Sequence, residues 1–148
     1  AHQALRAWLQ LLKCAKRIEQ RMNLHFQLEY RSSLSRFDVL AQLARVSPAP
    51  LSTGELAERL LASRGNISRL LDRMAVDGLI RRLADEGDRR IVMVYLTRRG
   101  DRLFRRMAAD HRRWTRELFD SFGEHELHTL NRLLHRLREQ ADGAEAES

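Results

Sequence analysis

The side chains best suited to binding chemistry lie near the middle of the chain, on one side of a predicted helix over residues 64–77. Ile67, Leu70, Leu71 and Met74 recur at helical spacing and would face a core. Asp72 lies at the centre of the opposite side. That side otherwise carries groups that hydrogen-bond base edges and phosphates, with a glycine that permits close approach: Arg64, Gly65, Asn66, Ser68, Arg69 and Arg73. A plain solvated face, the alternative, more often carries Glu and Lys pairs.

A second group of charged residues follows directly. Two short strands, 80–83 and 91–96, are rich in β-branched residues and are joined by a turn that contains Gly87. The turn carries Asp88, Arg89 and Arg90. An arginine at the tip of such a ribbon can enter a narrow minor groove, and Asp88 can hold a neighbouring guanidinium in position. Alone, this sequence would predict a solvated turn; directly after the helix, it favours a DNA contact.

The remaining elements are predicted from spacing and from helix-capping residues. The chain has 7 Gly and 2 Pro, which divide it clearly. The first expected helix spans 4–29, and the second runs from a cap at Ser35, with Asp38, to Pro48. The third runs from the capping box of Ser52 and Glu55 to near Leu61, and the fourth from a cap at Ser63 to a stop at Gly78. The fifth begins at a cap at Thr97, and the sixth begins after Gly123.

This order predicts a mainly α fold with a small β-hairpin wing, in which a short helix, a second helix and a hairpin form a winged helix-turn-helix. We expect an N-terminal dimerisation helix over 1–34, the DNA-binding region over 35–97 and C-terminal dimerisation helices over 98–148, as one compact domain overall. The long terminal helices carry apolar stripes that one small DNA-reading unit cannot cover, so a second copy of the chain is expected to cover them.

Composition agrees with a nucleic-acid partner. The 148 residues contain 27 Lys plus Arg and 20 Asp plus Glu, a net charge of +7. Residues 98–116 hold 8 basic and 2 acidic groups, whereas 51–97 hold 8 and 7. A local positive field favours a polyanion, because neutralising phosphates releases counterions. The placement of the arginines on one helix face and at a hairpin tip therefore says more than the total.

Several classes of protein find no support in the sequence. There is no phosphate-binding glycine loop, dinucleotide fingerprint or nucleophile elbow, so no catalytic residue is assigned and no enzyme is expected. No cofactor is expected. His125 and His128 are three residues apart, which does not suit a metal pair, and no metal site is predicted. The absence of an 18-residue apolar run or a signal-peptide pattern, together with a single cysteine, Cys14, favours a cytoplasmic location away from membranes.

A family resemblance rests on four short motifs. Leu70-Leu71-Asp72-Arg73-Met74, Gly78-Leu79-Ile80, Asp88-Arg89-Arg90, and Leu96-Thr97 with Gly100 resemble the signature of the MarR family of bacterial transcription regulators. The resemblance implies that helix 64–77 reads the major groove and that Arg90, braced by Asp88, enters the minor groove. It also implies a homodimer on pseudo-palindromic double-stranded DNA.

The resemblance further implies control by a small molecule. Regulators of this kind commonly bind aromatic or phenolic anions in a crevice between the dimerisation helices and the DNA-reading unit. Candidate residues for such a crevice are His25, Phe37, His111 and Trp114, although a histidine in an apolar stripe is more often structural. We therefore expect a sequence-specific regulator, a repressor released by an aromatic or acidic effector or its thioester. The alternatives are a thiol sensor using Cys14 and an architectural protein that coats DNA without sequence preference.

Overall fold

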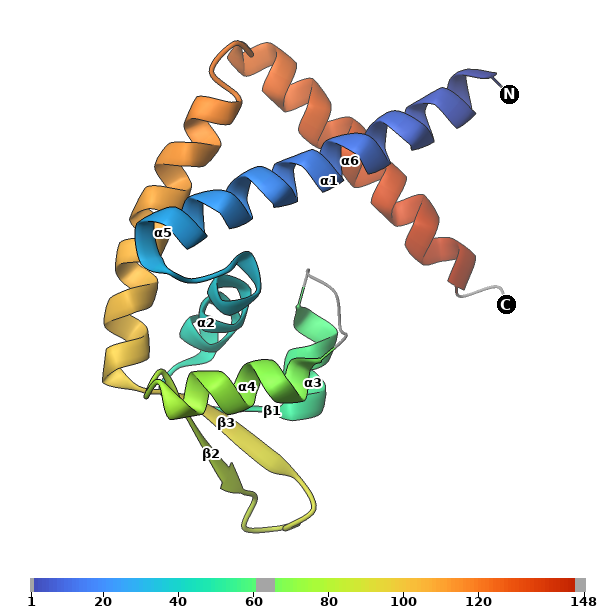
Figure 1. Cartoon of the computed structure of the whole chain (residues 1–148). Coiled ribbons are helices and arrows are strands. Elements are labelled where there is room, and N and C mark those ends of the chain that lie inside the picture. The colour runs from blue at the N-terminus through green and yellow to red at the C-terminus, as the bar shows by residue number, and fades with distance from the viewer. Residues whose placement is uncertain (1, 61–65, 146–148) are drawn as a thin grey trace. The chain divides into compact units, whose positions relative to one another are not determined.

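The computed structural model describes residues 2–60 and 66–145, and it confirms a mostly helical fold with a small antiparallel sheet (Figure 1). The chain divides into two compact units, Ala1–His111 and Arg112–Ser148. The elements are α1 (His2–Tyr30), α2 (Leu34–Val46), β1 (Leu51–Ser52), α3 (Thr53–Arg59), α4 (Ile67–Val76), β2 (Ile80–Ala84), β3 (Val92–Leu96), α5 (Arg98–Leu118) and α6 (Glu124–Glu145).

The sheet has three strands in the order β1-β3-β2, all antiparallel. The hairpin register runs from Ile80 opposite Leu96 to Ala84 opposite Val92, close to the predicted strands. Strand β1 was not predicted, because two residues are too short to show alternation. Leu51 pairs with Val94 and is buried. Strand β1 holds the hairpin of β2 and β3 next to the helices, and the tip of the hairpin extends away from them (Figure 1).

The turn between α4 and β2 has the predicted form. Gly78 has a φ of +74°, and its amide donates to the carbonyl of Ala75 while the amide of Leu79 donates to that of Met74. Leu79 is buried beneath this turn. A left-handed glycine of this kind ends a helix by satisfying its last carbonyls. The turn therefore fixes where β2 begins relative to α4.

Thr97 joins the end of α4 to the start of α5. Its hydroxyl donates to the carbonyl of Gly78 at 2.6 Å and accepts from the amide of Gly100 at 3.0 Å, so it caps α5 as predicted. Gly100 is buried, and a Cβ there would lie 2.1 Å from the carbonyl oxygen of Leu79. Only glycine allows the backbones to approach this closely. We call these three residues, Gly78, Thr97 and Gly100, the Thr97 joint.

The start of α2 differs from the prediction. Ser33, not Ser35, caps the helix, since its hydroxyl accepts from the amide of Arg36 at 3.1 Å. Ser35 lies inside α2, and Asp38 is buried rather than part of a cap. Two closely spaced serines made the choice ambiguous. By contrast, the capping box of Ser52 and Glu55 at α3 is confirmed.

Two other boundaries also shift. Helix α3 ends at Arg59, with Leu60 extended, two residues before the predicted end near Leu61. Helix α4 begins at Ile67, after Asn66 in a left-handed conformation with φ +69°. The predicted cap Ser63, with Arg64 and Gly65, lies outside the described residues.

The core of the first unit lies where α1, α2, α3, α4, the sheet and the first part of α5 meet. Its fully buried side chains include Phe26, Leu40, Leu43, Leu56, Leu71, Met74, Ile80, Val94 and Met107. The first half of α1 is different, because Leu5, Trp8, Leu9 and Leu12 are 42–57% exposed. In the second unit, α6 exposes Leu133, Leu134 and Leu137. None of the helices within residues 2–60 and 66–145 combines the length and apolar character that a membrane span requires.

Candidate DNA-binding surface and effector pocket

Helix α4 separates its apolar and polar residues. Leu71 and Met74 are buried, whereas Ser68, Arg69 and Arg73 are exposed. Asn66 is exposed as well, and its side chain makes no capping hydrogen bond. Helix α4 therefore presents a polar side with two arginines, a hydroxyl and an amide, which are the groups that contact bases and phosphates.

Asp72, at the centre of that side, has a partner on the wing. Its Oδ1 accepts from Nη1 of Arg82, on β2, at 2.6 Å. The sequence analysis placed Asp72 among the outward groups but did not connect it to Arg82, because a contact between a helix and a strand cannot be read from spacing. The pair ties the wing to α4 and occupies the one carboxylate on this side of the helix, which would otherwise repel phosphates.

A second ion pair fixes the other end of α4. Arg36, in the first turn of α2, contacts Asp77 at the C-cap of α4, with 2.8 Å between Nη1 and Oδ2. The guanidinium also lies near the carbonyl end of α4, where a positive charge is favourable. Arg36 therefore couples α2 to the end of α4.

The wing tip has a preorganised arginine. Arg90 donates from Nε to Oδ1 of Asp88 at 3.1 Å and from Nη2 to Oδ2 at 3.0 Å, and its backbone amide donates to Oδ1 at 3.0 Å. The amide of Asp88 in turn donates to Oδ2 of Asp85 at 3.1 Å. The Arg90 side chain is still 90% exposed. Three of the five guanidinium N–H groups remain for a ligand, and Arg89 beside it is also exposed.

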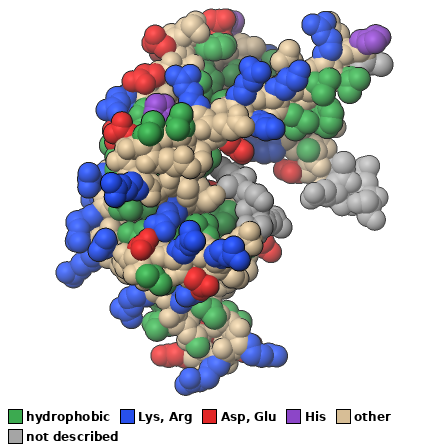
Figure 2. Space-filling model, in the orientation of Figure 1, with side chains coloured by type: hydrophobic (Ala, Val, Ile, Leu, Met, Phe, Trp, Pro, Cys, Tyr) green, Lys and Arg blue, Asp and Glu red, His purple; other side chains and the backbone are tan. Residues whose placement is uncertain are grey.

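Electrostatics favours the same arrangement. The side-chain hydrogen bond from Arg90 and the backbone one hold the pKa of Asp88 below its ordinary value. The same side-chain bond raises the pKa of Arg90. Both groups therefore stay charged near neutral pH, and the fork geometry limits the rotamers of the guanidinium. Figure 2 shows basic side chains along α5 and at the free end of the hairpin.

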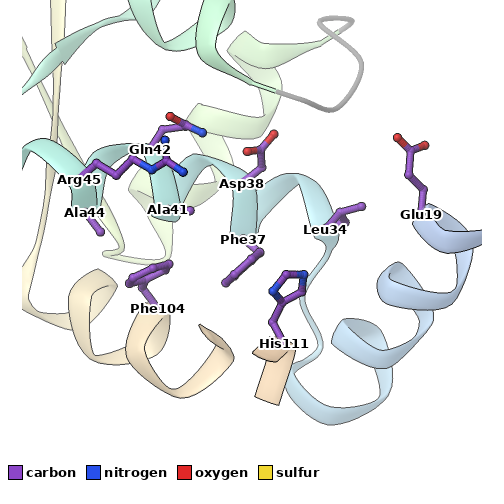
Figure 3. A pocket seen from close by; sticks show the side chains of 10 residues that line it. All are labelled: Glu19, Leu34, Phe37, Asp38, Ala41, Gln42, Ala44, Arg45, Phe104 and His111. Atoms are coloured by element: carbon purple, nitrogen blue, oxygen red, sulfur yellow. The ribbon is translucent and has the colours of Figure 1, made fainter. Parts of the chain in front are cut away.

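A separate pocket lies in the first unit beside α2 (Figure 3). Its volume is about 570 Å³, within the range of small-molecule sites. It is lined by Glu19 of α1, by Leu34, Phe37, Asp38, Ala41, Gln42, Ala44 and Arg45 of α2, and by Phe104 and His111 of α5. Aromatic and polar groups therefore meet in one place.

The rings in this pocket are close together. Phe37 lies 4.8 Å from His111 and 5.7 Å from Phe104, measured between ring centroids. Figure 3 shows these three rings turned toward one another on one side of α2, with the carboxyl group of Asp38 on the other. Burial lowers the pKa of His111, so its imidazole is held neutral. The pocket offers an aromatic surface on one side of α2 and hydrogen-bonding groups on the other.

Two of the four predicted effector residues line the pocket. Phe37 and His111 do, but His25 and Trp114 are not among its lining residues. Trp114 is buried in the second unit, and His25 is half-buried on α1. The sequence did not identify Phe104 as a pocket residue, and it predicted Asp38 only as part of a cap; both line the pocket. Among the described lining residues Arg45 is the only arginine.

The other candidate residues stand apart. Cys14, the candidate for thiol sensing, is an exposed free thiol on α1. Helix α2 contains no tyrosine that could serve as its partner. His125 and His128 are exposed on α6. Within the described part of the chain, no three His, Cys, Asp or Glu side chains are grouped as metal ligands.

An exposed polar helix beside a three-stranded sheet with a basic hairpin tip defines a winged-helix DNA-binding protein. Comparison with known proteins agrees with this class. Residues 33–91 match the model of the MarR family. The chain is 34% identical to the transcriptional regulator PecS of Dickeya dadantii over 74% of this chain and 66% of PecS, just under two thirds of its length.

Two further relatives extend the match along the chain. The transcriptional activatory protein BadR of Rhodopseudomonas palustris is 30% identical over 98% of this chain and 86% of its own length. A MarR family regulator of Silicibacter pomeroyi has a similar structure, with a TM-score of 0.82, 26% identity, and coverage of 95% of this chain and 96% of that one. The chain belongs to the MarR family of DNA-binding transcription regulators.

Proposed function

We propose that two copies of this chain bind an inverted-repeat operator as a sequence-specific repressor, and that a small aromatic effector releases them. The observation that carries the DNA-binding assignment is the exposed polar side of α4 beside the braced Arg90. Ser68, Arg69 and Arg73 would contact the major groove, while Arg90 would enter the minor groove. We place the protein in the cytoplasm, because DNA is found there and a single cysteine, Cys14, stays reduced there.

The homodimer is supported by apolar side chains that the chain itself leaves uncovered. Trp8 and Leu5 are 56% and 57% exposed on α1, and Leu137 is 52% exposed on α6. A patch of this kind on a long helix is typical of an interaction site. Paired subunits would present two copies of α4 about one DNA turn apart, which sets an inverted-repeat site.

The effector proposal rests on the pocket beside α2. The rings of Phe37, Phe104 and His111 lie against one another and form an apolar surface on which a planar ligand ring could stack. Hydrogen-bond donors on the ligand would suit the carboxylates of Glu19 and Asp38. With two carboxylates and one arginine, this lining favours a neutral phenol over an anion. An effector that binds the DNA-incompetent arrangement about 100-fold better would weaken operator affinity by roughly 2.7 kcal/mol at saturation.

The DNA-binding proposal is tested by selecting sequences from a random duplex library with the purified protein. We expect an inverted repeat with half-sites one turn apart. Arg69→Ala should lose affinity for the selected site more than for random duplex, and Arg105→Ala, on α5 and paired with Asp101, is the matched control. Equal binding to every duplex would favour the architectural alternative.

The oligomeric state is tested separately by sedimentation. The chain should be a dimer at micromolar concentration, and Leu9→Glu combined with Leu12→Glu should shift it toward a monomer. Leu83→Glu, an exposed leucine on the wing, is the matched control. A monomeric native chain would remove the basis for two half-sites.

The effector proposal is tested by a thermal-shift screen of phenols and aromatic acids, followed by release of labelled operator. Active compounds should lose their effect with Phe37→Ala and keep it with Phe122→Ala, an exposed phenylalanine in the second unit. Cys14→Ser should respond as the native chain does; loss of the response would favour the thiol sensor.

A further inference from the structure

A second cavity in the first unit differs from the effector pocket in chemistry. Its volume is about 470 Å³. It lies where the end of α1, the start of α2, the end of α4 and the first half of α5 come together. The lining residues are Tyr30, Arg31, Arg36, Asp77, Leu79, Arg99, Arg102, Leu103 and Arg106. Five arginines and one aspartate line it, so its charge is strongly positive.

Most of this positive charge is uncompensated. Arg36 pairs with Asp77, but no carboxylate of the described residues forms an ion pair with Arg31, Arg99 or Arg102. Arg106 lies over the ring of Tyr30, 5.8 Å from its centroid. Like charges gathered around one cavity repel one another, and a multivalent anion removes that repulsion.

The helix ends at the cavity contribute partial charges of both signs. Arg36 lies in the first turn of α2 and Arg99 in the first turn of α5, where the amino ends are partially positive, whereas α1 and α4 end at the cavity with partially negative carbonyl ends. The arginine side chains therefore supply the positive potential. Burial and a hydrogen bond from its hydroxyl to Asp110 raise the pKa of Tyr30 to about 12. The phenol therefore stays neutral and adds no negative charge to the cavity. Leu79 and Leu103 add apolar surface to the same cavity.

From these observations we propose that the arginine-lined cavity binds a small phosphate ester or diphosphate, and that binding draws Arg36 away from Asp77. Planar guanidinium groups pair with phosphate oxygens in a bidentate manner. The cavity is distinct from the effector pocket: none of the residues that line one lines the other.

The Arg36–Asp77 pair connects the cavity to the DNA-binding surface. A second depression is lined by Arg36, Asp72, Arg73, Val76 and Asp77, so the Arg36–Asp77 pair borders both regions. If an anion takes Arg36, Asp77 loses the contact that holds the end of α4 against α2. Anion and operator should then weaken each other's binding, by reciprocity of coupling. This step rests on the proposed DNA-binding function; the binding site itself does not.

The binding site is tested with inorganic pyrophosphate and the DNA-free full chain in isothermal titration calorimetry. We expect saturable binding, weakened about tenfold or more in the Arg99→Gln/Arg102→Gln variant, because each lost arginine removes charge-assisted hydrogen bonds. Arg105→Gln, on the same helix outside the cavity, should match the native chain. Circular dichroism establishes that each variant folds.

A gain-of-binding variant sharpens the test. Asp77→Asn frees Arg36 and should tighten pyrophosphate binding severalfold. Asp101→Asn, which also removes one negative charge but pairs with Arg105 outside the cavity, should have no such effect. No saturable binding by the native chain, or equal tightening in both variants, would overturn the proposal.

The coupling is tested by adding pyrophosphate to the operator complex at matched ionic strength, with sulfate as control. Operator affinity should fall in the native chain and not in Arg99→Gln/Arg102→Gln. If the native chain binds the operator but does not bind pyrophosphate, the proposed anion site is wrong and the proposed DNA-binding function is unaffected. If the double variant loses DNA affinity while the native chain ignores pyrophosphate, the arginines contact DNA phosphates, and the proposal is wrong.

Discussion

Asp72 of α4 and Arg82 of β2 are joined by a 2.6 Å hydrogen bond between Oδ1 and Nη1. The side chains are 62% and 33% exposed, so the pair contributes only about 0–1 kcal/mol to folding. Its role is geometric, since it links α4 to the hairpin, the two elements that the proposed function places in neighbouring grooves.

Arg82→Gln should therefore weaken operator binding more than it changes stability. We expect a loss of about 1 kcal/mol or more in operator affinity, with a change of less than about 1 kcal/mol in the free energy of unfolding. A double-mutant cycle with Asp72→Asn, measured on the selected operator, isolates the pair. Arg81→Gln, the exposed neighbour on β2, is the matched control. Additive effects would show that the contact does not position the wing.

Arg90→Ala should weaken operator binding by about 1–3 kcal/mol, the usual range for one groove contact. Fluorescence anisotropy on the selected site measures this loss. Asp88→Asn keeps the arginine but removes its brace, so it should reduce preference for a narrow minor groove while raising affinity for random duplex. Unchanged titration curves for Arg90→Ala would remove the wing from the DNA interface.

Gly100→Ala should destabilise the fold by about 3 kcal/mol or more, beyond ordinary overpacking. The added Cβ would lie 2.1 Å from the carbonyl oxygen of Leu79, and backbone atoms cannot yield as a flexible side chain does. Urea denaturation measures the change. Gly143→Ala in α6, where a Cβ would meet nothing within 4 Å, should be neutral or stabilising. Similar stabilities for the two variants would contradict the close contact.

His111 should make stability depend on pH. Burial lowers its pKa below the ordinary 6.5, so the unfolded chain binds more protons between the two values. The stabilisation from neutral His111 is complete above the unfolded pKa and is lost as pH falls below it. Relative to His111→Gln, the native chain should lose stability as the pH falls through the ordinary value of 6.5 and below it. A difference that stays constant with pH would refute this.

The sequence was most informative where local chemistry decides the structure. Three predicted local features are present: the capping box of Ser52 and Glu55, the left-handed Gly78 and the cap at Thr97. Each depends on residues only a few positions apart. Long-range geometry was harder to predict. The β1 strand and the contact of Arg82 with Asp72 depend on how separate elements pack, which spacing along one chain does not show.

The candidate pockets show the same division. His111 was predicted as a polar aromatic group that interrupts an apolar stripe, and Phe37 as an aromatic residue at the start of the second helix. Trp114 has the same character but lies elsewhere, since one turn of α5 moves a side chain out of the pocket. The arginine-lined cavity could not be predicted from the sequence, because its lining residues come from four separate helices or their ends, α1, α2, α4 and α5. In the sequence its arginines look like ordinary surface arginines.

The Thr97 joint has a practical consequence for protein engineering. Because Gly78, Thr97 and Gly100 interlock across the boundary between β3 and α5, residue 97 is a natural crossover point for chimaeras. A DNA-reading cassette exchanged between relatives should stay correctly seated if the donor and recipient both supply this trio. Hybrids that split it would place a methyl group against a carbonyl or leave α5 uncapped, so they would fail by misfolding before operator choice could be assayed.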